Sequence, residues 1–122
     1  MISPETETGR LLRSTANLLN SVAEAAWANS IRSPAKWDLH RIGTEAYLAQ
    51  RDILDVLGLP AVMAEPQADF DIAVALEQAA HTLAAIPRKV RNLDTERLEA
   101  RVSSLADRAE RALAVRHAIR LG

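Results

Sequence analysis

Residues 37–58 read WDLHRIGTEAYLAQRDILDVLG, and this stretch decides the fold of the chain. Its apolar residues recur at intervals of three and four, the spacing that places side chains along one face of an α-helix. Charged residues fill the opposite side. A helix that is apolar along one whole face needs other helices to cover that face, so the stretch predicts a helical core. The residues of this predicted seam are Leu39, Ile42, Ala46, Ala49, Ile53 and Val56.

Capping residues and prolines predict where the helices begin and end. Serine followed by proline at 3–4 and at 33–34 combines a good N-cap with a residue suited to the first helical position. Asp94 is a further candidate N-cap. Gly58 is suited to the left-handed position after a helix, and Pro87 ends or kinks one. We therefore predict helices over residues 3–30, 34–57, 66–86 and 94–120.

Composition and connection lengths favour one architecture for these helices. The 122 residues include 23 alanines and 16 leucines, and long β-branched or aromatic runs, which favour strands, are absent. Short connections make neighbouring helices antiparallel. We predict an all-α fold, an antiparallel four-helix bundle that forms a single domain over residues 1–122. Phe70 and Val74 are expected to widen the apolar stripe of the third helix. Gly43 costs about 1 kcal/mol relative to alanine inside a helix, so either another backbone approaches it closely or the bundle tolerates it.

The sequence also bears on the compartment. It contains no cysteine, so disulfide and thiolate chemistry are excluded. The first eight residues are acidic and polar, unlike a secretory signal, and no window approaches 18 uninterrupted apolar residues. We expect a cytoplasmic protein with no membrane partner.

A metal centre is not expected. Helical bundles hold di-metal sites through glutamates and Glu-x-x-His motifs. Here Glu77 and His81 are four residues apart, and no second pair of this kind exists. We therefore predict neither a metal ion nor a cofactor.

Charge is distributed unevenly along the chain. Residues 1–86 carry 6 basic and 11 acidic side chains, a net charge of −5, whereas residues 87–122 carry 9 basic and 5 acidic, a net charge of +4. This basic region either packs against acidic helices or binds the phosphates of a nucleic acid. The overall pI of about 6.3 is low for a nucleic-acid-binding domain, so a nucleic-acid-associated regulatory protein is the second hypothesis. Its candidate phosphate-binding residues are Arg88, Lys89, Arg91, Arg97 and Arg101.

Arg111 and His117 suggest a third, more remote hypothesis. An arginine and a histidine six residues apart resemble the pair found in small helical HEPN ribonucleases. That resemblance implies that Arg111 holds the scissile phosphate while His117 performs acid–base chemistry. A polar residue often follows the arginine in that family, whereas Ala112 follows it here.

The few aromatic residues point to the favoured hypothesis. Trp27 ends the first predicted helix and Trp37 opens the second, so an antiparallel hairpin brings them to the same end. They either plug that end of the core or form a binding surface, because tryptophan is enriched at interaction hot spots. Tyr47, Leu48 and Leu54 either widen the core face or extend that surface. We expect a non-enzymatic helical protein–protein interaction module that associates with itself as a homodimer. The predicted interface residues are Trp27, Trp37, Tyr47, Leu48 and Leu54.

Overall fold

The structure is a computed structural model that describes residues 3–30, 36–60, 71–86 and 93–121. Within these ranges it places all side chains except those of residues 36, 93–94 and 113–121. These residues form four α-helices and no strand. The predicted all-α four-helix bundle is confirmed. The helices are α1 (Glu7–Ser30), α2 (Lys36–Leu57), α3 (Ile72–Ala84) and α4 (Leu93–Leu121).

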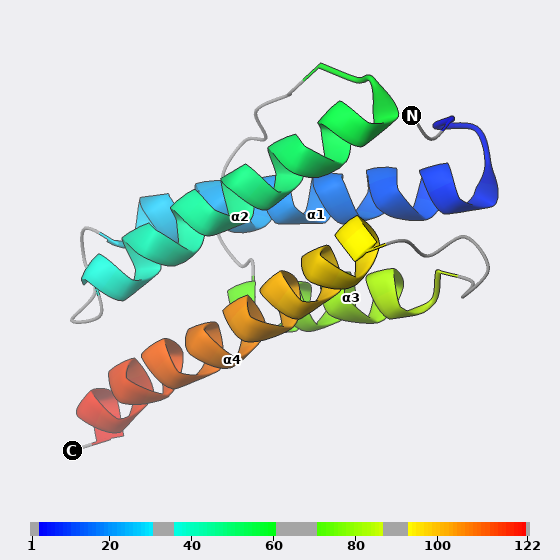
Figure 1. Ribbon diagram of the computed structural model, residues 1–122. Helices are drawn as coiled ribbons and strands as arrows, with labels where there is room; N and C mark the ends of the chain where they lie inside the picture. Colours follow the sequence, from blue (N-terminus) through cyan, green and yellow to red (C-terminus); the bar gives the residue numbers. More distant parts are fainter. Residues whose placement is uncertain (1–2, 31–35, 61–70, 87–92, 122) are drawn as a thin grey trace.

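The helices form two antiparallel pairs that pack against each other (Figure 1). The most extensive contact is between α1 and α2, followed by that between α3 and α4. The pairs meet where α1 contacts α3 and where α2 contacts α4. The order around the bundle is therefore α1, α2, α4, α3. Because α3 has 13 residues and α4 has 29, the last turns of α4 extend beyond α3 (Figure 1).

The predicted seam of α2 lies at the centre of the core. Five of its six residues are fully buried, and Val56 is half-buried. The other helices supply leucine, valine and alanine to the same cluster, for example Leu19, Leu76 and Leu105. Small alanines between these larger residues let the helices approach closely, and burial of the apolar surface stabilises the bundle.

The start of α1 differs from its prediction. We expected Ser3 to be the N-cap, but the helix begins at Glu7, and the hydroxyl of Thr6 accepts a hydrogen bond from the backbone N–H of Gly9 (3.0 Å). The Ser3 carbonyl accepts from the Thr6 hydroxyl (2.8 Å). The Ser3 carbonyl and Pro4 occupy the space that a side chain at Gly9 would need. Glycine at position 9 therefore allows the preceding turn to fold against the helix.

The end of α2 matches its prediction. Gly58 has a φ of 68°, the left-handed conformation that favours glycine. Its N–H donates to the Asp55 carbonyl (3.1 Å), and the Leu59 N–H donates to the Leu54 carbonyl (2.9 Å). This pair of bonds is the Schellman motif, which satisfies carbonyls that the end of a helix leaves free. The predicted start of this helix at Pro34 lies outside the described residues.

The third helix begins later than residue 66. Asp71 has an extended backbone and is the N-cap, its side chain accepting from the Val74 N–H (3.1 Å). Residues 66–70 lie outside the described part of the chain, and Phe70 is among them. Val74 was expected to widen the buried stripe, but it is 47% exposed because it lies on the outer side of α3.

The fourth helix begins at Leu93, so Asp94 lies in its first turn and is not the N-cap that we expected. Among the described residues, no helix is both long enough and apolar enough to cross a membrane.

Candidate functional site

The outer face of α2 carries two large apolar side chains that the core does not cover. Trp37 is 75% exposed and Leu48 is 45% exposed. They are eleven residues apart, which at 3.6 residues per turn brings them to within about 20° of the same direction. The separation along the helix axis is about 16 Å. Trp37 and Leu48 therefore belong to one stripe, and we call it the α2 outer stripe.

Two ion pairs connect α2 to α4 on one side of this stripe. Asp52 pairs with Arg101 at 2.7 Å, and Glu45 pairs with Arg108. The acids are seven residues apart on α2 and the arginines are seven residues apart on α4. Because the helices are antiparallel, the matching spacing aligns both pairs at once.

A hollow lies between the two ion pairs, and we call it the α2–α4 notch. It has a volume of about 470 Å³ and is lined by Glu45, Leu48, Ala100, Arg101, Ser104, Leu105 and Arg108. Ala100 and Ser104 are exposed, and their small side chains leave this part of the α4 surface open. An apolar wall of Leu48 and Leu105 between two arginines suits an apolar or aromatic side chain, because a flat ring packs on both methyl groups and guanidinium planes.

Trp27 acts as the plug that we considered for this end of the hairpin. Its indole is half-buried and packs on Tyr47, with ring centroids 5.8 Å apart and planes inclined by 47°. Its ring also fills the space over Gly43. Of the two possibilities for Gly43, a close approach is found. The nearest neighbour is the Trp27 side chain, and the backbone carbonyl of Ala23 lies slightly farther away. The two tryptophans differ in burial, since Trp37 is largely exposed.

Leu54, one of the predicted interface residues, is buried. It is 7% exposed and lies in the hydrophobic core. It lies on the flank of α2 toward α1, whereas Leu48 lies on the other flank, where it lines the α2–α4 notch. Of the five predicted interface residues, only Trp37 and Leu48 are exposed.

The structure describes part of the basic segment. Arg101 is paired with Asp52, which reduces its availability to an external phosphate. Arg97 is exposed on α4. Arg88, Lys89 and Arg91 lie outside the described residues. One of the two interpretations of the basic region was that it packs against acidic helices. Arg101 and Arg108 do so, through their ion pairs with acids on α2.

The pair that resembles the HEPN motif is only half described. Arg111 is exposed, and its Nε donates to the Asp107 carbonyl (3.4 Å) within α4. The side chain of His117 lies outside the described residues, so the pair stays a prediction.

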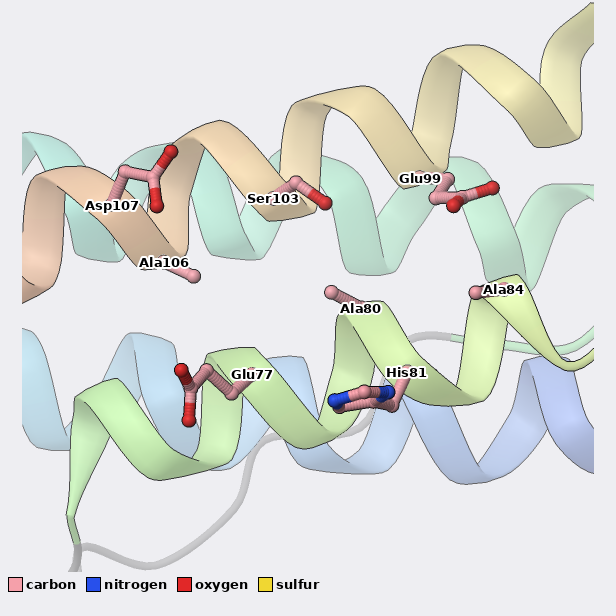
Figure 2. Close-up of a pocket in the computed structure, with 8 residues that line it drawn as sticks. All are labelled: Glu77, Ala80, His81, Ala84, Glu99, Ser103, Ala106 and Asp107. Atoms are coloured by element: carbon pink, nitrogen blue, oxygen red, sulfur yellow. The ribbon is translucent and has the colours of Figure 1, made fainter.

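Several titratable side chains line the groove between α3 and α4, and the sequence did not predict that they lie together. Glu77 and His81 come from α3, and Glu99, Ser103 and Asp107 come from α4, around a hollow of about 290 Å³. Figure 2 shows that the Glu77 and Asp107 carboxylates point away from each other. In the described part of the chain, no three His, Asp or Glu side chains are grouped as metal ligands.

Sequence reasoning missed the two ion pairs and the notch that they border. The signal was the repeated seven-residue spacing of acid on α2 and arginine on α4. Such spacing is informative only when the two helices are known to be neighbours.

Comparisons with protein-family models, with curated proteins and with solved structures found no match.

Proposed function

We propose that this chain is a non-enzymatic helical protein–protein interaction module, located in the cytoplasm, which binds through the α2 outer stripe and associates with itself. The observation that carries the proposal is the exposure of Trp37 at 75% on the same stripe as the exposed Leu48. Burial of a tryptophan on binding removes a large apolar area from water, so this residue type dominates many interfaces. The notch beside Leu48 offers a concave surface next to this convex one.

A photo-cross-linking amino acid at position 44 tests the proposal. Thr44 is exposed on α2 between Trp37 and Leu48. In a lysate of the source cells, we expect a cross-linked product of defined mass, either a dimer of the chain or one further protein. The Trp37→Lys variant should lose this product. Val74→Lys is the matched control, because it makes the same change at an exposed apolar residue on α3.

Two results would contradict the proposal. One is the absence of any discrete product from position 44. The other is a product that Trp37→Lys leaves unchanged, or that also forms when the cross-linker is placed at the exposed Gln78 on α3.

A further inference from the structure

The geometry points to a second copy of this chain as the occupant of the α2 outer stripe, in a two-fold symmetric dimer whose α2 helices run antiparallel and in which Trp37 of each copy enters the α2–α4 notch of the other. This inference rests on the proposed function and specifies its partner and its mode of binding.

The spacing of the stripe carries the first step. Consider two facing α2 helices related by a two-fold axis that is perpendicular to both. When the axis passes between residues 42 and 43, Trp37 of one copy is level with Leu48 of the other. The same operation places the second Trp37 level with the first Leu48, so both contacts form together. This reciprocity is what a two-fold interface requires.

The position of the notch carries the second step. Leu48 lies between Glu45 and Asp52, whose ion pairs border the notch on its two sides. Because these acids are seven residues apart, the borders are separated by about 10 Å along the helix. A Trp37 level with Leu48 of the other copy therefore arrives between the two ion pairs. There Leu48 and Leu105 form an apolar wall, and Ala100 and Ser104 of α4 are small.

Charge complementarity carries the third step. Arg41 and Glu45 lie about 40° and 80° around α2 from Trp37, both on the side toward α4. The two-fold operation keeps them on that side and brings Arg41 of one copy within one residue's rise of Glu45 of the other. Glu45 is half-buried and already pairs with Arg108. A carboxylate has two oxygens and accepts from both arginines, so Glu45 also offsets the repulsion between the two Arg41 side chains near the axis.

The first test measures self-association by sedimentation. We expect a concentration-dependent monomer–dimer equilibrium in the natural chain. Trp37→Ala should raise the dissociation constant roughly tenfold or more, because a central tryptophan is a typical hot spot. Arg41→Glu should also raise it, since each introduced acid then faces Glu45 of the other copy. Arg13→Glu, the same change at an exposed residue of α1, should leave it unchanged.

The second test reports which surfaces meet. The chain has no cysteine, so an Arg97→Cys variant takes up a single nitroxide label. Position 97 is one turn from Arg101, beside the notch, and its side chain does not line the hollow. This labelled copy is mixed with isotope-labelled natural chain, and the indole N–H signals are recorded. We expect the signal of Trp37 to broaden and that of the half-buried Trp27 to broaden less. A label at Asn17→Cys on α1 should broaden neither.

A chain that stays monomeric up to ~1 mM would overturn the inference. A dimer in which the Arg97 label leaves the Trp37 signal sharp would overturn it as well, because another surface then forms the interface. The cross-linking test separates this inference from the wider proposal. A product between position 44 and a different protein would support binding through the α2 outer stripe, and it would reject both the self-association and the symmetric dimer.

Discussion

Gly43 on α2 lies directly against the indole of Trp27 on α1. A Cβ atom at position 43 would be 2.6 Å from both Cδ1 and Nε1 of that ring and 3.2 Å from the Ala23 carbonyl oxygen. The ring is held from another direction by Tyr47. The absence of a side chain at one residue thus allows a large side chain on the neighbouring helix to enter the contact between α1 and α2.

We predict that Gly43→Ala lowers the free energy of unfolding by about 1 kcal/mol. Overpacking costs about 1–3 kcal/mol, and the better helix propensity of alanine recovers about 1 kcal/mol of it. Denaturant unfolding measures the change. In a Trp27→Leu background the clash with the indole is gone, so Gly43→Ala should be neutral or stabilising there. An equal loss in both backgrounds would show that the Trp27 ring is not the cause.

Leu48 and Leu54 provide a matched pair on one helix. We predict that Leu54→Ala lowers the free energy of unfolding by about 2–5 kcal/mol, because it removes buried methyl groups and leaves a cavity. Leu48→Ala should change the free energy of unfolding by no more than about 0.5 kcal/mol, because Leu48 is 45% exposed and lies outside the core. Urea unfolding, at a protein concentration too low for the dimer to form, measures both changes. Similar losses for the two variants would contradict the assignment of Leu48 to the surface.

The two ion pairs between α2 and α4 should contribute little to stability. Their side chains are 36–56% exposed, and exposed pairs typically contribute about 0.2–1 kcal/mol. Double-mutant cycles of Asp52 with Arg101 and of Glu45 with Arg108 should give coupling energies in that range, decreasing as salt is added. A cycle of Asp52 with Arg97 is the control, and it should give no coupling. Coupling well above this range would show that the pairs are more strongly desolvated than their exposure indicates.

Asp71 should determine how well the short helix α3 is held at its start. We predict that Asp71→Ala costs about 0.5–2 kcal/mol, because the Val74 N–H loses its acceptor. Asp71→Ser keeps an acceptor at this position and should cost much less. Hydrogen exchange of the first turn of α3 provides the local measurement, and protection that Asp71→Ala leaves unchanged would argue against the capping role.

The sequence by itself determined the helices, their buried faces and the end of α2. These features depend on neighbours three to five residues away, through helical hydrogen bonds and through the periodicity of the side chains. For that reason the sequence was sufficient to predict the five fully buried residues of the seam and the left-handed conformation of Gly58. The starts of α1 and α3 were predicted less well, because several residues can serve as the cap. At α1, Thr6 takes that role in place of Ser3.

Only the tertiary structure decided which helix lies beside each flank of α2. The flank toward α1 buries Leu54 and receives Trp27, whereas the flank toward α4 forms the ion pairs of Glu45 and Asp52. Periodicity gives a residue its direction on its own helix, but it does not say what lies in that direction. The neighbour follows from the packing of all four helices at once, and the α2–α4 notch exists only where two of them meet.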